Sequence, residues 1–371
     1  MMVCLFWTVM VATDICRGWR SRASCHLLLF MATATVLYWG HCAFFTRSMA
    51  IMPLADTLYL TANLLVFPLF LLYIGALTTR RADHRLQWLF TLPAIAGGTC
   101  CGIVYTLMSS SEVAEFTDLY LYRHQMKGLH GMAMQQAFIH DTSKVFFAIL
   151  IIPIYIIGRQ RLNSYEHLLS DTYSNLENKT LKPLSRLLLT FSVVAVASFT
   201  ANAIGRHQFT SSPWLLAVPS VLFAALLFAV GYTSWQQRFS IDDIEAEEKL
   251  SDNTESMQSQ TSELRQRIEM VMMDERLYLQ PNLKIADIVQ RLGTNRNYVY
   301  NAINRETGMS FNEYVNRMRI NYAEQLMTLY PDKSITEISE MSGFSSSTSF
   351  YRNFKTFKGI GPREFRIKLK H

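Results

Sequence analysis

The chain has 371 residues, of which 50% are hydrophobic, and a formal net charge of +6. This length has room for two or three domains, and the hydrophobic share is at the upper limit for a soluble protein. The six cysteines have neither a metal-site spacing nor the density of a disulfide-rich secreted mini-protein. Long apolar runs end at Trp235, and no later uncharged run approaches the roughly 20 residues that span a bilayer. The composition therefore predicts a membrane half followed by a soluble half.

Six apolar segments up to Trp235 are candidate membrane spans. They are residues 25–45, 53–77, 86–108, 145–158, 187–205 and 213–235. The segment at 145–158 is short, so we expect its helix to begin near His140, with Asp141 and Lys144 at the outer end. Residues 1–12 are either a clipped first helix or an interfacial segment, and we favour seven helices over six.

Lysine and arginine collect in alternate loops of this half. The basic loops precede the segment at 25–45, follow the one at 53–77 and fill residues 159–186, whereas the loop at 109–143 is mixed in charge. Short cytoplasmic loops of membrane proteins are enriched in lysine and arginine. The pattern therefore predicts a membrane protein with these loops and the C-terminus in the cytoplasm.

A few polar side chains fall within the proposed spans, where ionisable groups are costly and often functional. The candidate sensor groups are Asp56, Asn63, His140, Asp141 and Asn202. In the alternative interpretation the ionisable groups lie at wetted helix ends, and the two asparagines form hydrogen bonds between helices.

Catalytic and metal sites are not indicated by any compact motif. His124, His130 and His140 share the long outer loop and its edge, but their spacing matches no known ligand pattern. No G-x-S-x-G nucleophile elbow is present. Adjacent Cys100 and Cys101 are interpreted as packing residues rather than a redox sensor, because free cysteine behaves as a small hydrophobe. We therefore expect no enzyme activity, no cofactor and no metal.

The soluble half begins with an acidic and polar linker at residues 236–262. Seven acidic residues and one lysine lie within residues 241–262, and the segment has too little apolar surface to fold alone. Residues 263–371 instead carry 17 Lys or Arg against 12 Asp or Glu. This basic surplus suits contact with phosphates.

Helical periodicity runs through the basic region. A helix with one apolar face is predicted at 263–277, and two short helices at 285–292 and 295–306 surround a break at Gly293, as in a helix-turn-helix unit. A long amphipathic helix is predicted at 311–329.

A second short pair follows the long helix. Ser334 with Glu337 forms an S-x-x-E capping box that starts a helix ending at Gly343. An aromatic stripe led by Phe350 and Phe354 marks the next helix, which closes at Gly359. The helix-turn-helix pattern therefore occurs twice, and its two recognition helices are predicted to enter major grooves about 34 Å apart on one face of DNA.

The run S-I-T-E-I-S-E-M-S-G-F-S-S-S-T-S-F-Y-R-N-F-K-T-F-K-G-I-G-P-R-E-F-R at residues 334–366 resembles the signature of the AraC/XylS family of bacterial transcription regulators. The resemblance covers residues 263–368, and the layout looks like that of membrane-anchored members. Two residues depart from the usual pattern: Ser339 stands in place of alanine, and Gly361 in place of Thr or Ser. Lys284 occupies the first N-cap, which weakens that helix.

The resemblance implies which side chains contact DNA. The base-reading positions carry over to Arg296, Asn297, Tyr300, Asn301, Ser347, Thr348, Tyr351 and Arg352. These side chains have donors and acceptors that suit base edges. Phosphate contacts are expected from Arg305, Lys355 and Lys358. Alternatively, the two tyrosines pack in the domain, and Arg352 is a structural salt-bridge partner.

The sequence thus predicts an all-α protein in which a polytopic transmembrane bundle (1–235) and a linker (236–262) precede an AraC-type double helix-turn-helix domain (263–371). The predicted function is membrane-bound transcription regulation that couples a membrane or periplasmic signal to promoter binding. Expected partners are double-stranded DNA, the lipid bilayer, a second copy of the chain, RNA polymerase and an unidentified small-molecule or membrane signal. The alternative is a transporter or channel with a regulatory DNA-binding domain, which would show inverted repeats with broken helices.

Overall fold

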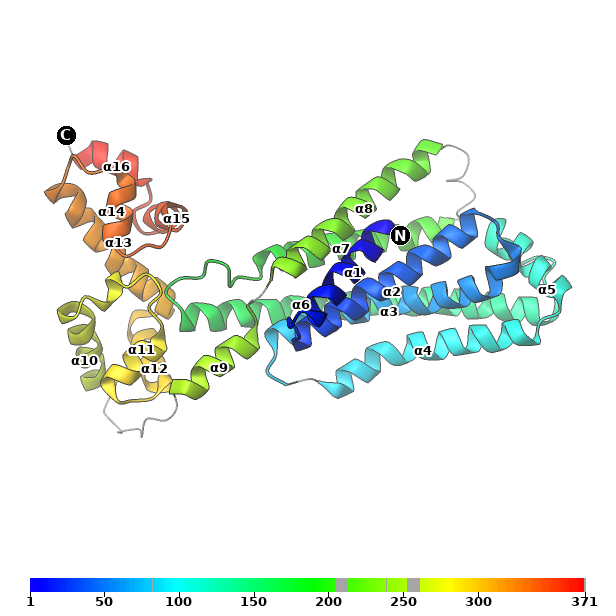
Figure 1. Ribbon diagram of the computed structural model, residues 1–371, viewed down its shortest axis with the longest axis horizontal. Coiled ribbons are helices and arrows are strands. Elements are labelled where there is room, and N and C mark those ends of the chain that lie inside the picture. Colours follow the sequence, from blue (N-terminus) through cyan, green and yellow to red (C-terminus); the bar gives the residue numbers. More distant parts are fainter. Residues whose placement is uncertain (82, 205–212, 238, 252–260, 370–371) are drawn as a thin grey trace. The chain divides into compact units, whose positions relative to one another are not determined.

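A computed structural model describes the chain except for residues 82, 205–212, 238, 252–260 and 370–371, and except for some side chains in helices next to these gaps. The described residues form helices and no strand, with one isolated bridge between Tyr173 and Lys284. They divide into two compact units (Figure 1). The first contains Met1–Ser164 and Leu181–Ile241, and the second contains Tyr165–Thr180 and Asp242–His371.

The first unit is built from long apolar helices. Its helices are α1 (Met2–Cys16), α2 (Arg22–Phe45), α3 (Met52–Thr78), α4 (His84–Leu107), the first part of α6 (Gly131–Thr172), α7 (Lys182–Ile204) and α8 (Pro213–Gln236). Helix α3 packs against both α2 and α4, and its Phe70, Leu71 and Ile74 are fully buried. It is therefore the centre of this helical layer.

Among the described residues, four helices are long and apolar enough to cross a membrane: α2, α3 with the 3-10 turn η1 (Met49–Ile51) before it, α4 and α6. They coincide with four of the six predicted spans, and α1 is a shorter apolar helix. The predicted spans at 187–205 and 213–235 fall on α7 and α8, and Gly205 and the side chain of Asn202 lie outside the described residues.

Helix α6 is longer than predicted and includes residues that were predicted to lie in the loops on both sides of it. It begins at Gly131 rather than near His140, and it continues to Thr172 rather than ending at the predicted span. The outer region before it is not a loop either, because it forms α5 (Ser110–Glu115) and the π-helix η2 (Phe116–Tyr122). The helix extends past the apolar span because residues 159–172 contain no proline or glycine and bury an apolar stripe of Leu162, Tyr165 and Leu169.

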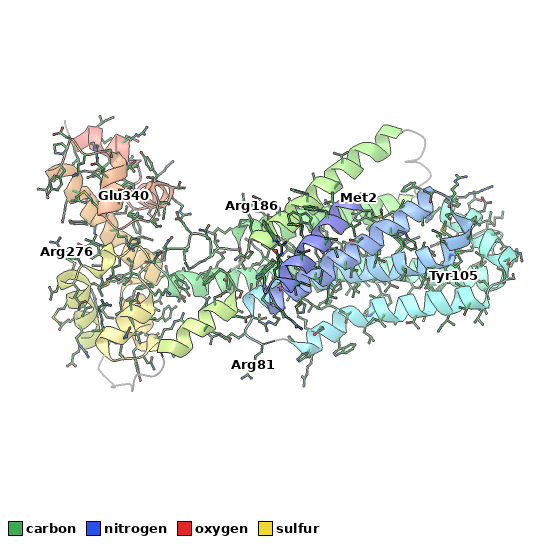
Figure 2. All side chains as sticks on the ribbon, in the orientation of Figure 1. Met2, Arg81, Tyr105, Arg186, Arg276 and Glu340 are labelled. Atoms are coloured by element: carbon green, nitrogen blue, oxygen red, sulfur yellow. The ribbon has the colours of Figure 1, made fainter. Side chains whose placement is uncertain are left out.

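Basic residues gather at one end of the first unit. Arg22 donates to the carbonyl oxygens of Ala76 and Arg80 at 3.4 and 3.3 Å, and Arg159 donates to Ser185. Such donors satisfy the carbonyl groups that a helix leaves free at its C-terminus. Figure 2 shows Arg81 and Arg186 at this end and Tyr105 at the other. The loops predicted to share one side of the membrane therefore lie together.

The second unit holds the remaining helices around two apolar cores. They are α9 (Ile241–Ser251), α10 (Thr261–Asp274), the 3-10 turn η4 (Leu277–Leu279), α11 (Ile285–Leu292), α12 (Arg296–Thr307), α13 (Phe311–Leu329), α14 (Ile335–Met341), α15 (Ser347–Lys358) and α16 (Pro362–Leu369). One core lies among α10, α11, α12 and the start of α13. The other lies between the rest of α13 and the pair α14 and α15. Helix α13 thus contributes to both cores.

Helix ends in this unit follow the local sequence. The capping box of Ser334 and Glu337 forms as predicted, and Ser310 forms another with Glu313. Lys284 is the N-cap of α11, but its backbone N–H donates to the Asp287 carboxylate at 2.7 Å. Asp287 therefore forms the half of a capping box that binds the N-cap backbone N–H, while the lysine side chain has no acceptor for the other half.

We predict that Gly343→Ala destabilises the protein more than Gly359→Ala does. Both glycines have positive φ, +84° and +77°, which costs an alanine about 1–2 kcal/mol. A Cβ at Gly343 would also lie 2.7 Å from the Leu279 backbone, whereas one at Gly359 would meet nothing within 4 Å. Overpacking adds roughly 1–3 kcal/mol. Calorimetric unfolding of the detergent-solubilised chain measures both losses, and equal losses would contradict the close approach.

Candidate nucleic-acid interface

Helix α15 has one exposed face with polar and cationic side chains. Thr348, Arg352 and Lys355 are exposed at positions i, i+4 and i+7, so they share one side of the helix. Phe350 and Phe354 are fully buried on the opposite side. The aromatic stripe thus anchors α15 and turns the three polar side chains to solvent.

Helix α12 repeats this arrangement. Asn297 and Arg305 are exposed and Asn301 is half-buried, at spacings of four residues. Val299 and Ala302 are fully buried on the other side. The Asn295 side chain caps the helix by accepting from the backbone N–H groups of Asn297 and Tyr298. Each short pair, α11 with α12 and α14 with α15, therefore presents the outer face of its second helix.

Burial and ion pairing distinguish between the alternative roles of individual side chains. Tyr300 and Tyr351 are partly buried and pack against the two cores, which supports a packing role for both. Arg352 is exposed and forms no ion pair with a described residue, so the salt-bridge alternative finds no support. Ser347 is half-buried at the start of α15.

The three cationic side chains that are expected to contact phosphates differ in exposure and in ion pairing. Arg305 and Lys355 are exposed, and neither forms a salt bridge with a described residue. Lys358 is partly buried, and its Nζ lies 2.5 Å from a carboxylate oxygen of Glu324 on α13. That ion pair must open before Lys358 can meet a phosphate.

Comparisons with known proteins match this region. Residues 288–368 match the family described as "Helix-turn-helix domain". The C-terminal region of this chain carries an AraC-type helix-turn-helix domain. The Msm operon regulatory protein of Streptococcus mutans is 33% identical over 90 residues, which are 24% of this chain and 32% of that protein. The melibiose operon regulatory protein of Escherichia coli is 33% identical over 84 residues, which are 23% of this chain and 28% of that protein.

The chain thus spans about a third or less of the length of these relatives. An uncharacterized HTH-type transcriptional regulator of Staphylococcus aureus is 30% identical over 90 residues, only 12% of its length. No solved structure matches the chain. In the AraC-type domain, Ser339 in place of the family's usual alanine is buried, and its hydroxyl has no hydrogen-bond partner among the described residues.

A segment made of the end of α6 and the residues before α7 packs against the AraC-type domain. This docking segment, Tyr165–Thr180, belongs to the second unit. The Ser174 backbone N–H and hydroxyl both donate to the Leu283 carbonyl, at 3.0 and 2.7 Å. The Asn312 amide donates to the Ser174 carbonyl at 2.7 Å, and the buried Tyr173 ring lies under Lys284. The sequence offered no sign of this contact beyond the apolar stripe of α6.

The docking segment reaches the starts of both exposed helices. Arg296, the first residue of α12, donates to the Thr172 hydroxyl at 2.5 Å. Ser346, the N-cap of α15, donates to the Glu177 carboxylate, and Ser345 donates to the same group at 3.2 Å. A carboxylate at a helix N-terminus occupies the kind of position that favours a phosphate. Thr172 and Glu177 thus engage a predicted base-reading residue and the cap of the second helix.

Arg319 of α13 joins the docking segment to the domain. Its guanidinium is 1% exposed and donates to the carbonyls of Tyr278 and Gln280 at 2.6 Å each and to the Ser174 hydroxyl at 3.2 Å. Burial lowers the pKa of Arg319 to about 10, so the group stays charged at neutral pH. These acceptors offset much of the cost of burying the charge.

The polar groups predicted within the spans form two pairs in the first unit. His140 Nε2 lies 2.9 Å from Asp56 Oδ2, and both side chains are buried, so the interpretation of wetted helix ends is wrong for them. Asp141 pairs with Lys144 at 2.9 Å. Asn63 is half-buried on α3.

We predict that Arg319→Met lowers the free energy of unfolding of the second unit by about 3 kcal/mol, because buried carbonyls lose charged donors. Arg317→Met is the matched control, since Arg317 is exposed on the same helix and should change stability by less than about 0.5 kcal/mol. Denaturant unfolding of the full chain in detergent gives both values. A loss no larger than that of the control would refute the anchoring role.

Proposed function

We propose that the protein is a membrane-bound transcription regulator that binds specific promoter DNA through α12 and α15 and couples this binding to a signal at its membrane unit. The observation that carries the proposal is the AraC-type domain, in which two helix pairs each present an exposed polar face. Two relatives are named as operon regulatory proteins. Under this proposal the chain also controls transcription of target genes.

In this proposal the α11–α12 pair and the α14–α15 pair are each a helix-turn-helix unit. Asn301 and Arg352 suit adenine and guanine edges, while Arg305 and Lys355 suit phosphates, which position the protein without specifying sequence. The nineteen residues of α13 span about 28 Å. That length is close to the roughly 34 Å between successive major grooves on one face of DNA.

The membrane location is supported by the first unit alone. Four described helices are long and apolar enough to cross a bilayer, and basic residues gather at one end of the unit. The positive-inside rule assigns that end to the cytoplasm. We therefore propose an inner-membrane protein with a cytoplasmic C-terminal domain that works as a homodimer and engages RNA polymerase.

Coupling to a signal is proposed to run through α6. This helix contributes residues to both units, with the boundary between Ser164 and Tyr165. Its end and the following residues hold Arg296 and Ser346, which lie at the starts of the two DNA-facing helices. A signal shifts the equilibrium only by its differential affinity for two states, and the docked and undocked forms of this segment are such states.

We predict that combining Asn301→Ala with Arg352→Ala abolishes discrete promoter occupancy without removing the protein from the membrane. Each lost base contact costs about 1–3 kcal/mol. Chromatin immunoprecipitation of the tagged full-length protein, with membrane fractionation in parallel, measures both properties. Lys368→Ala also removes an exposed positive charge from the domain and is expected to keep the peaks.

Peaks that survive the double substitution would refute the assigned base-reading residues. An absence of peaks for the unaltered chain would refute direct transcriptional control and would favour the transporter alternative. Occupied promoters with the protein in the soluble fraction would refute the membrane location alone.

We predict that Glu177→Gln tightens promoter binding by about tenfold, because one charge-assisted contact at the start of α15 is weakened in the docked form. Glu364→Gln is the control, since it makes the same charge change at an exposed position of α16. Dissociation constants of the full chain in lipid nanodiscs, measured at one fixed salt concentration, compare the two. Equal gains would show a general charge effect instead of release from docking.

A further inference from the structure

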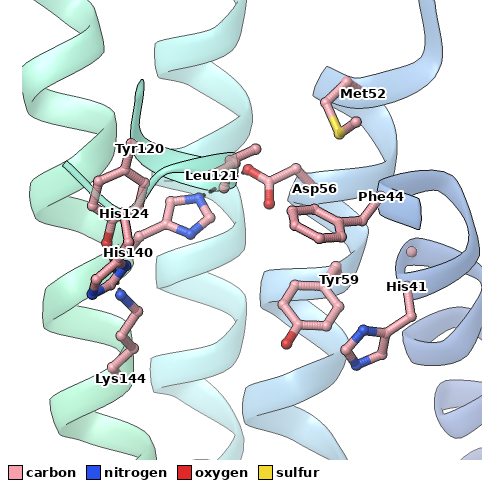
Figure 3. A pocket seen from close by; sticks show the side chains of 11 residues that line it. His41, Phe44, Met52, Asp56, Tyr59, Tyr120, Leu121, His124, His140 and Lys144 are labelled. Carbon is pink, nitrogen blue, oxygen red and sulfur yellow. Dashed lines mark hydrogen bonds and ion pairs between the residues drawn. The ribbon is translucent and has the colours of Figure 1, made fainter. Parts of the chain in front are cut away.

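The first unit contains a pocket between four of its elements. Side chains from α2, α3, η2 and α6 line a cavity of about 50 Å³, and Figure 3 shows two of them, Asp56 of α3 and His140 of α6, pointing toward each other. Most of the unit is apolar, so an ionisable pair at this position needs an explanation beyond packing.

A third chemically active group lies beside this pair. Asp56, Cys101 of α4 and His140 each offer one ligand atom, and these atoms lie within 4.8 Å of one another. The three residues are 6%, 0% and 8% exposed. A carboxylate, a thiol and an imidazole thus converge from three helices that are well separated in sequence.

Hydrogen bonds within the protein leave part of this cluster unsatisfied. Tyr105 donates to Asp56 at 2.7 Å, and Gln136 donates to Cys101 Sγ at 2.9 Å. His140 Nε2, however, is close to Asp56 without a hydrogen-bonding geometry. The Gln136 oxygen, on a fully buried side chain, also has no partner among the described residues. Buried polar atoms without partners are uncommon and costly.

We propose that Asp56, Cys101 and His140 form a binding site for a divalent transition-metal ion of the Zn²⁺ class. Oxygen, sulfur and nitrogen ligands together suit Zn²⁺ and chemically similar ions, whereas Mg²⁺ and Ca²⁺ prefer oxygen alone. Bonds of about 2.0–2.3 Å in a tetrahedral site place neighbouring ligand atoms roughly 3.3–3.7 Å apart. The observed spacing therefore requires only small side-chain movements.

The surroundings supply the other requirements of a metal site. The Gln136 amide donates to Cys101 Sγ at 2.9 Å and holds that sulfur in place, and a water molecule would complete a four-coordinate site. The pocket that Asp56 and His140 line offers an entry path. The nearby Lys144 ammonium lies 2.9 Å from Asp141, which offsets the positive charge that would repel an entering cation.

This site differs from the histidine cluster considered from the sequence. His130 is largely exposed near Glu115, and His124 lies at the pocket without belonging to the three-ligand group. Only His140 belongs to both groups. Sequence spacing could not reveal the site because its ligands come from different helices.

Cobalt binding tests the proposal, because a thiolate ligand gives Co²⁺ a sulfur-to-metal charge-transfer absorption band. The full chain is purified in detergent through a tag without histidine, stripped with chelator and titrated with Co²⁺, then with Zn²⁺ to displace it. We expect one equivalent of Co²⁺ per chain, with the charge-transfer band. Zinc should also raise Tm, since a ligand that binds the folded state stabilises it.

Matched substitutions assign the ligands. Cys101→Ser should remove the band and Cys100→Ser should retain it, because Cys100 is exposed. Asp56→Asn and His140→Gln should each weaken binding by at least about tenfold, with an unchanged Tm in chelator showing that the variants fold. A band that is absent, or that survives Cys101→Ser, would overturn the proposal. No step uses DNA, so the outcome is independent of the proposed function.

Discussion

The buried guanidinium of Arg319 is the constraint on which the second unit depends. A charge that is 1% exposed must have its donors satisfied. Its acceptors are backbone carbonyls at residues 278 and 280 and the Ser174 hydroxyl. One side chain therefore fixes the turn before α11, the long helix α13 and the docking segment together. The centre of the Phe344 ring also lies 5.6 Å from this guanidinium, so the turn between α14 and α15 packs at the same place.

This arrangement gives α6 a role that a simple span would not have. Its middle is apolar enough to cross a membrane, while its last turns belong to the compact unit that contains the AraC-type domain. The docking segment uses Thr172 and Glu177 to engage the starts of α12 and α15. Docking and DNA binding would then both use the Arg296 side chain and the start of α15, which is the physical basis for a two-state regulator.

The first unit is held together mainly by apolar packing rather than by a buried charge. Its helices associate through apolar packing around α3, yet it concentrates Asp56, Cys101 and His140 at one buried place. Polar groups that face the interior of a helical bundle are costly unless they have partners or bind a ligand. Their incomplete hydrogen bonding separates this cluster from the Asp141 and Lys144 pair, in which both side chains also form hydrogen bonds with the Tyr120 hydroxyl.

Local patterns in the sequence by themselves determined helices α11 to α15 of the C-terminal region. Helix α13 begins and ends at the predicted residues, and the Ser334 capping box forms, because caps, periodicity and glycine stops act within a few residues. They also determined the exposed faces of α12 and α15. Only the tertiary structure decided the length of α6, the docking of Glu177 and the meeting of Asp56 with Cys101 and His140. Those contacts join side chains from different helices, so their partners become neighbours only when the helices pack.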